Sequence, residues 1–195
     1  MTICVYGASS SLIDKAFLEN TYNLGKTMAM RGHGLVYGAG ANGVMGSVAR
    51  GVKENGGSVL GVAPTFFNVD GVLYDGCDSI IPTETMRERK KIMEDKADAF
   101  IIAPGGVGTM DEFFEIFTLK QLGRHKKPIV IFNLNGFYDN LVAMLQNFVD
   151  KKFMGSESIK LIGVFDNEKD ILDYIETYHQ TEIDPQKMRV ITEEK

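Results

Sequence analysis

A glycine-rich stretch in the middle of the chain has the residue types and spacing of a phosphate-binding turn. Pro104-Gly105-Gly106-Val107-Gly108-Thr109 directly follows the apolar run 99–103. Closely spaced glycines let backbone N–H groups approach a ligand. A helix that begins here presents unpaired N–H groups and a partial positive charge, which favour an anion such as phosphate. A tight turn without any ligand explains the glycines equally well.

Two carboxylates follow this stretch at helical spacing. Glu112 and Glu115 are neighbours on the surface of the expected helix, and Thr118 extends the same side. Thr109 is the expected N-cap, because Glu112 completes a capping-box pattern with it. The alternative is that both carboxylates face solvent near a helix N-terminus, where negative charge is favourable.

Two cations interrupt the apolar stripe of a charged helix expected over 84–97. At 3.6 residues per turn, Arg89 and Lys90 share a face with Met86 and Met93. An unpaired buried charge is costly, so this placement predicts an anionic partner for the two cations. The alternative is that their stems pack against the core while their charged ends reach water.

Alternating strands and helices must position these residues. Strands are expected at 2–7, 35–37, 58–63, 79–81, 99–103, 128–132 and 161–164, and helices over 14–31, 44–55, 84–97, 110–122, 136–152 and 167–178. This alternation predicts an α/β fold with a doubly wound parallel sheet and helices on both faces. Ligands of such sheets bind outside the carboxyl ends of the strands. The turns 7–11, 38–43 and 104–109 are therefore expected along one rim.

A second glycine pattern follows the second expected strand. Gly38-x-Gly40-x-x-Gly43 matches a dinucleotide-binding fingerprint by spacing and context. A NAD site also needs an acidic residue at the end of the next strand, and that strand ends in Val62-Ala63-Pro64. We therefore expect a nucleotide-sized site rather than a NAD site. The aperiodic stretch 64–79, which contains Phe66 and Phe67, is expected to be a functional loop.

Composition excludes several classes of protein. The 195 residues indicate one domain over 1–180 and a charged C-terminal tail over 181–195. The net charge of −5 argues against nucleic-acid binding. We find no signal peptide and no apolar run of bilayer length, which predicts a cytoplasmic protein without membrane contact. Two cysteines and scattered histidines give no metal-ligand spacing, so no metal is expected.

Four stretches resemble motifs of the LOG (lonely guy) family, cytokinin-activating phosphoribohydrolases long mislabelled as lysine decarboxylases. Residues 104–112 resemble the signature PGGxGTxxE, and residues 86–90 resemble its companion arginine–lysine motif. Residues 37–46 resemble YGGGxxGLMG, and residues 121–128 resemble QLGxHxKP. The chain departs from the pattern at Ala39, Arg87 and Asp111, where glycine, histidine and glutamate are usual.

The resemblance implies a Rossmann-like fold, a homodimer or higher homo-oligomer, and no cofactor. It further implies hydrolysis of the N-glycosidic bond of an adenosine 5'-monophosphate, with or without an N6 substituent, to free base and ribose 5-phosphate. The expected catalytic residues are Arg89, Glu112 and Glu115. The expected substrate- and phosphate-binding residues are Gly7, Ser9, Ser10, Gly38, Gly40, Gly43, Lys90, Pro104, Gly105, Gly106, Val107, Gly108, Thr109 and Thr118.

Two other classes of function are compatible with the same residues. The same fold suits a non-catalytic nucleotide or molybdenum-cofactor carrier, and also a signalling module that binds a nucleotide without hydrolysing it. Intact Arg89 and Glu112 favour the enzyme.

The helices 84–97 and 110–122 are expected to face a partner subunit, because they carry the large apolar residues Met86, Phe113, Phe114 and Phe117.

Overall fold

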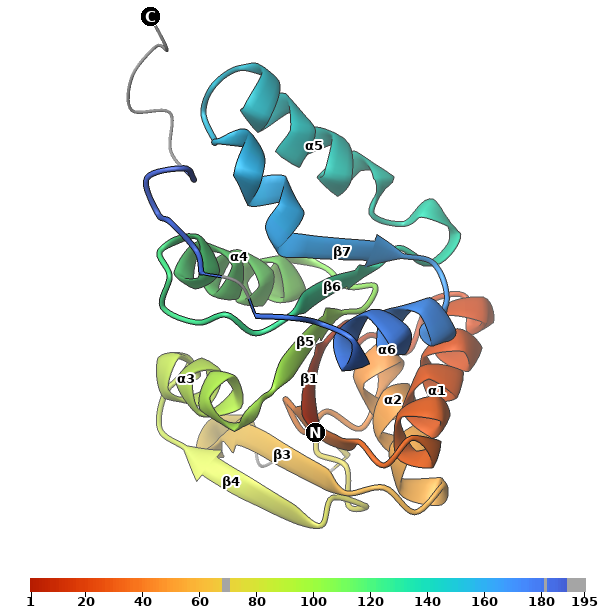
Figure 1. The fold of residues 1–195 in the computed structure, drawn as a ribbon. Coiled ribbons are helices and arrows are strands. Elements are labelled where there is room, and N and C mark those ends of the chain that lie inside the picture. The colour runs from red at the N-terminus through yellow and green to blue at the C-terminus, as the bar shows by residue number, and fades with distance from the viewer. Residues whose placement is uncertain (68–70, 181, 189–195) are drawn as a thin grey trace, which may run out of the picture.

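A computed structural model describes residues 1–67, 71–180 and 182–188. Within them, parallel strands form one sheet in the order β4-β3-β2-β1-β5-β6-β7 (Figure 1). The strands are β1 (Thr2–Tyr6), β2 (Gly34–Tyr37), β3 (Val59–Pro64), β4 (Ser79–Thr83), β5 (Ala99–Ile102), β6 (Ile129–Phe132) and β7 (Ile162–Phe165). The predicted doubly wound α/β sheet is confirmed.

Helices cover both faces of this sheet (Figure 1). One face packs against α1 (Lys15–Met30), α2 (Gly43–Glu54) and α6 (Glu168–Glu176). The other packs against α3 (Met86–Lys96), α4 (Val107–Gln121) and α5 (Asp139–Asp150). Three short 3-10 helices complete the described elements: η1 (Thr65–Phe67), η2 (Leu134–Gly136) and η3 (Ser156–Leu161).

The central strands are buried on both faces, which explains why they appear in the sequence as continuous apolar runs. In β1, Ile3 and Val5 point into the core under α1, α2 and α6, whereas Cys4 and Tyr6 point into the opposite core. The chain builds outward from β1 to β4 and then returns to β5, the other neighbour of β1. Strand order therefore reverses between β1 and β5, which is where ligands bind in folds of this kind.

The start of α4 differs from the prediction. The helix begins at Val107 rather than Met110, and its N-cap is Gly106, without a side-chain cap. The prediction that Thr109 is the N-cap is wrong, because Thr109 lies inside the first turn. Its hydroxyl packs under the turn, and a Cβ on Gly105 would lie 2.1 Å from Thr109 Oγ1.

Two of the four apolar residues expected to face a partner subunit are instead buried in the core of this chain. Phe113 and Phe117 are 0% and 2% exposed and lie in the core between α4 and the sheet. Met86 is 39% exposed, since it is the first residue of α3, and the buried part of that stripe contains Arg89 and Met93. The prediction of a partner-facing surface is therefore wrong for Phe113 and Phe117.

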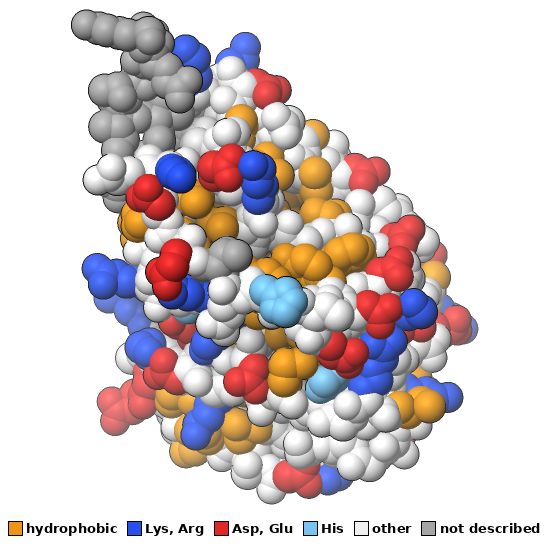
Figure 2. Space-filling view, in the orientation of Figure 1, with side chains coloured by type: hydrophobic (Ala, Val, Ile, Leu, Met, Phe, Trp, Pro, Cys, Tyr) orange, Lys and Arg blue, Asp and Glu red, His pale blue; other side chains and the backbone are white. Residues whose placement is uncertain are grey.

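The surface in view in Figure 2 intermingles acidic and basic side chains, without one sign dominating. Within the described part of the chain, no helix combines the length and the apolar character needed to cross a bilayer. Of the predicted tail over 181–195, residues 181 and 189–195 lie outside the described residues. Met188 packs into the core beside α4, so part of the tail belongs to the folded body.

Glycines allow α1 and α2 to pack backbone against backbone. A Cβ on Gly51 would lie 2.1 Å from the carbonyl oxygen of Tyr22, and a Cβ on Gly25 would lie 2.2 Å from that of Val48. We expect Gly51→Ala to lower the free energy of unfolding by about 2–3 kcal/mol, because backbone atoms must move apart. Urea unfolding measures this change. Gly108→Ala is the control, because its Cβ would meet nothing within 4 Å; an equal loss in both variants would contradict the prediction.

Candidate functional site

Three turns meet at the carboxyl ends of the central strands, as the sequence predicts. The Ala8 N–H donates to the carbonyl of Pro104 at 3.0 Å, and the Met45 N–H donates to the carbonyl of Ala8 at 3.1 Å. Gly43 has φ +62°, and a Cβ there would lie 2.5 Å from the carbonyl oxygen of Ser10. Backbone contacts therefore fix the turns 7–11, 38–43 and 104–109 against one another.

A cavity of about 300 Å³ opens at this rim. Its volume lies at the small end of the range for ligand pockets. The described residues that line it are Ser9, Gly38, Gly40, Ala41, Asn42, Met45, Phe67, Val72, Leu73 and Arg89. Polar groups and an arginine thus share the cavity with a cluster of apolar side chains.

Arg89 enters the cavity wall from α3 and is almost fully buried, at 5% exposed. Its Nε donates to the carbonyl of Val62 at 3.2 Å, and its Nη1 donates to Glu112 Oε1 at 2.7 Å. A Cβ on Gly38 would lie 1.8 Å from the Nη2 atom. Gly38 must therefore be glycine so that the guanidinium can lie against the turn.

Glu112 is the anionic partner that the placement of Arg89 predicts. The carboxylate is 8% exposed and belongs to α4, next to the glycine-rich turn. Burial raises the pKa of Glu112 above its ordinary value, although the Arg89 guanidinium lowers it. A buried carboxylate whose basicity is raised in this way is suited to act as a general base.

Glu115 is engaged by a different cation. Lys90 forms ion pairs with Glu115 and with Asp111, the latter at 2.9 Å. Burial lowers the pKa of Lys90, but its hydrogen bonds to Glu115 and Asp111 raise it more, which keeps the ammonium charged. Lys90, Glu115 and the exposed Thr118 are absent from the described lining of the cavity, and so is Glu112, which is joined to it through Arg89.

The glycine-rich turn presents open backbone at the same rim, although none of the residues 104–109 is among the described lining residues of the cavity. Gly106, Val107 and Gly108 are exposed, and a Cβ on either glycine would meet nothing within 4 Å. The Met110 N–H donates to the Gly106 carbonyl at 3.0 Å and makes the first backbone bond of the helix. The earlier N–H groups of α4 therefore lack an intrahelical acceptor, which is the arrangement that binds anions.

The stretch that the sequence predicts as a functional loop supplies most of the apolar part of the cavity, although Val72 and Leu73 are not among the predicted site residues. The Ala41 N–H donates to the Val72 carbonyl, and the Tyr74 N–H donates to the Ala39 carbonyl, both at 2.9 Å. These bonds bring Val72 and Leu73 over the 38–43 turn, where Phe67 and Met45 also lie. The adjacent aromatics Phe66 and Phe67 in the aperiodic stretch were the available signal.

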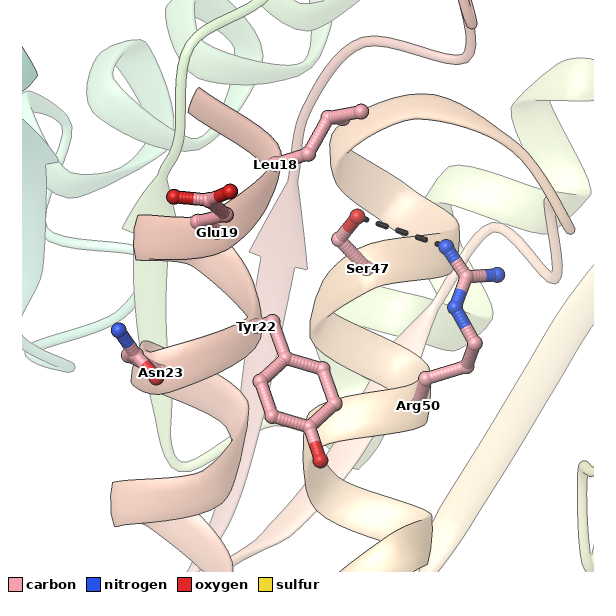
Figure 3. A pocket seen from close by; sticks show the side chains of 6 residues that line it. All are labelled: Leu18, Glu19, Tyr22, Asn23, Ser47 and Arg50. Atoms are coloured by element: carbon pink, nitrogen blue, oxygen red, sulfur yellow. Dashed lines mark hydrogen bonds between the residues drawn. The ribbon is translucent and has the colours of Figure 1, made fainter. Parts of the chain in front are cut away.

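Arg50 supports the same turn from a second, shallow cavity of about 440 Å³ between α1 and α2 (Figure 3). Its Nη1 donates to the carbonyl of Ala41 at 2.9 Å, and its Nη2 donates to Ser47 Oγ at 3.4 Å. The other described lining residues are Leu18, Glu19, Tyr22 and Asn23. Ala41 thus lies between the two cavities.

The sequence matches a known protein family over most of its length. Residues 45–175 match the family described as "Possible lysine decarboxylase". The cytokinin riboside 5'-monophosphate phosphoribohydrolase of Mycobacterium tuberculosis (strain ATCC 25618 / H37Rv) is 40% identical over 171 residues, which cover 88% of this chain and 91% of that protein. The enzyme of the same activity named LOG2 from Arabidopsis thaliana is 35% identical over 176 residues, or 90% of this chain and 83% of that one.

The chain belongs to the LOG family. The predicted resemblance is therefore confirmed, and it extends over most of the chain.

One solved structure with the LOG-like fold has another role. The molybdenum cofactor carrier protein of Chlamydomonas reinhardtii matches with a TM-score of 0.69 and 22% identity, covering 90% of this chain and 95% of that one. Identity this low shows the shared fold alone.

The residues do not fit the chemistry that the older family description names. Lysine decarboxylation needs a lysine that binds pyridoxal phosphate in a pocket. Lys120 is fully buried in this LOG family member, and its Nζ donates to the carbonyl of Leu161 at 2.7 Å. Burial lowers the pKa of Lys120 to about 8. Since neither Lys120 nor Lys90 lines the rim cavity among the described residues, the decarboxylase chemistry does not fit this site.

Proposed function

We propose that this protein hydrolyses the N-glycosidic bond of adenosine 5'-monophosphate, or of its N6-modified forms, to the free base and ribose 5-phosphate. The observation that carries the proposal is the buried Arg89–Glu112 pair. Arg89 lines the rim cavity, and Glu112 belongs to the helix whose N-terminus follows the glycine-rich turn. The names of the relatives support the same reaction class.

Glu112 and Arg89 take different roles in this reaction. Hydrolysis of an N-glycoside passes through an oxocarbenium-like sugar, which needs negative charge nearby and an oriented water. The Glu112 carboxylate supplies the charge and accepts a proton from the attacking water. Arginine side chains carry a permanent positive charge, so Arg89 acts as an electrostatic clamp on the phosphate or the leaving base rather than as an acid.

The glycine-rich turn holds the 5'-phosphate in this proposal. Free N–H groups at the start of α4 bind the phosphate oxygens and so fix the sugar next to Glu112. The proposed substrate contacts are Gly7, Ser9, Ser10, Gly38, Gly40, Gly43 and the stretch 104–109. The apolar side chains Met45, Phe67, Val72 and Leu73 receive the base and any N6 substituent. No step requires a metal or a redox cofactor.

A panel of nucleoside 5'-monophosphates tests the proposal. The protein is incubated with each compound, and released ribose 5-phosphate is measured, while calorimetry follows binding of the same nucleotides. Release from adenosine 5'-monophosphate or an N6-modified form is the expected result. Tight binding without release from any monophosphate would replace the enzyme with the non-catalytic carrier of the same fold.

Arg89 needs its fork-shaped guanidinium. We expect Arg89→Lys to lower kcat about 10-fold or more, because an ammonium cannot reach Val62 and Glu112 in the same geometry. Initial rates of ribose 5-phosphate release at saturating substrate measure the change. Arg31→Lys is the matched control, since Arg31 pairs with Asp173 on a different surface. Full activity of Arg89→Lys would reduce the role of Arg89 to that of a general positive charge.

We further propose that the protein is a cytoplasmic homodimer or higher homo-oligomer that binds neither nucleic acid nor membrane. Exposed apolar side chains support an interface, including Met86 at 39% exposed and Val107 at 87% exposed beside the site. Light scattering at micromolar concentration is expected to give at least twice the chain mass of 21.6 kDa. A monomer mass would contradict the assembly and leave the chemistry untouched.

A further inference from the structure

Two adjacent sets of ion pairs join α3 to α4. Arg89 pairs with Glu112 at 2.7 Å, and Lys90 pairs with Asp111 at 2.9 Å and also with Glu115. Neighbouring residues of α3 therefore bind neighbouring residues of α4. The Lys90 side chain is 13% exposed, whereas the side chains of its partners Asp111 and Glu115 are 60% and 39% exposed, so the three charges meet at the edge of the contact between the helices.

This arrangement leaves Lys90 poorly placed to bind a phosphate. Its ammonium already meets two carboxylates, which would repel a phosphate dianion. In the same way, the Glu115 carboxylate forms an ion pair with Lys90 and is therefore not available to act with Glu112 in catalysis.

We propose that Lys90 and Glu115 are positioning residues, which fix α3 against α4 and so hold Arg89 on Glu112. This inference rests on the proposed function and replaces the phosphate-binding and catalytic roles that the family resemblance gives to the two residues. Arginine and glutamate have long, flexible side chains, and a displacement of about 1 Å in a catalytic group can cost about 100-fold in rate. A second set of pairs one residue away constrains that displacement.

The test compares Lys90→Met and Glu115→Gln in steady-state kinetics with adenosine 5'-monophosphate. Each variant is expected to lower kcat about 10-fold or more, while KM and competitive inhibition by inorganic phosphate change by less than about 3-fold. The double variant is expected to be no slower than the slower single variant, because both changes break one unit. Lys90→Arg is expected to keep most of the activity, since a guanidinium also binds two carboxylates.

Lys91→Met is the matched control. Lys91 lies beside Lys90 on α3 but pairs with Asp95 on the exposed side of the same helix. Its rates are expected to equal those of the wild type. A loss as large as that of Lys90→Met would overturn the positioning role, because any lost cation on α3 would then have the same effect.

A crystal structure of Lys90→Met gives a reading that does not depend on activity. The Arg89–Glu112 hydrogen bond is expected to open beyond about 3.5 Å. The proposal is overturned if that contact stays at the 2.7 Å of the native pair. It is also overturned if inhibition by inorganic phosphate weakens about 10-fold in Lys90→Met alone, because Lys90 would then bind phosphate. If the wild-type protein releases no ribose 5-phosphate, the proposed function is refuted. The crystal structure of Lys90→Met would still show whether Lys90 holds Arg89 on Glu112.

Discussion

Replacing Glu112 with glutamine is expected to lower kcat at least ~100-fold, because the change removes the charge and the basicity of the side chain while conserving its shape. Released ribose 5-phosphate measures the rate at saturating adenosine 5'-monophosphate. The variant leaves Arg89 buried without its counter-ion, which lowers stability. Near-ultraviolet circular dichroism therefore has to confirm the native fold at the assay temperature.

The pH dependence gives this prediction a second readout. Burial raises the pKa of Glu112, so the carboxylate becomes protonated at a higher pH than an exposed glutamate does. Since the ionised form is the active one, kcat of the wild type falls as pH drops through that raised pKa. The acid limb should be missing from Glu112→Gln and present in Glu157→Gln, a surface control that pairs with Lys160. A wild-type rate in Glu112→Gln would move the role to another group.

Removal of the 5'-phosphate from the substrate is expected to have an effect of similar size. Adenosine should release adenine at least ~100-fold more slowly than adenosine 5'-monophosphate, even when both are saturating. The reason is that phosphate binding at the start of α4 positions the sugar, and binding energy used in this way appears in turnover as well as in affinity. Adenine release from the two compounds, measured side by side, gives the ratio.

Inorganic phosphate supplies the control for that experiment. It should bind the open turn around Gly106 and Gly108 and compete with the monophosphate, but it should leave the slow cleavage of adenosine unchanged. Comparable rates for adenosine and its monophosphate would refute both the phosphate-binding turn and the phosphoribohydrolase reaction.

The parts of the site that depend on regular structure could be predicted from the sequence. Parallel strands place their carboxyl ends on one edge, so the three turns had to share a rim. Helical periodicity placed Arg89 in a buried stripe, and the cost of burying a charge required an anion there. That anion is Glu112 of the same chain, and neighbouring Lys90 likewise pairs with Asp111 and Glu115.

Other parts of the site could not be predicted, because sequence patterns describe local structure and carry no information on contacts between distant segments. Thr109 satisfies the pattern of an N-cap, yet its hydroxyl packs against Gly105 and Gly106 takes the capping position. Val72 and Leu73 reach the cavity through hydrogen bonds between two loops, which follow no periodicity. Large apolar residues such as Phe113 and Phe117 are typical of subunit interfaces, but here both side chains pack against the sheet of their own chain.

The charges between α3 and α4 also affect the association of an anionic nucleotide with the protein. Arg89 and Lys90 are already matched by Asp111, Glu112 and Glu115, so this part of the site carries no excess of positive charge. Long-range attraction of a dianion needs such an excess, and it weakens as salt is added. The attraction available here comes instead from backbone dipoles at the start of α4, which act over a few ångströms. Two cations facing three carboxylates, in a chain of net charge −5, give no long-range attraction for salt to weaken, so the rate of substrate capture is expected not to fall as ionic strength rises.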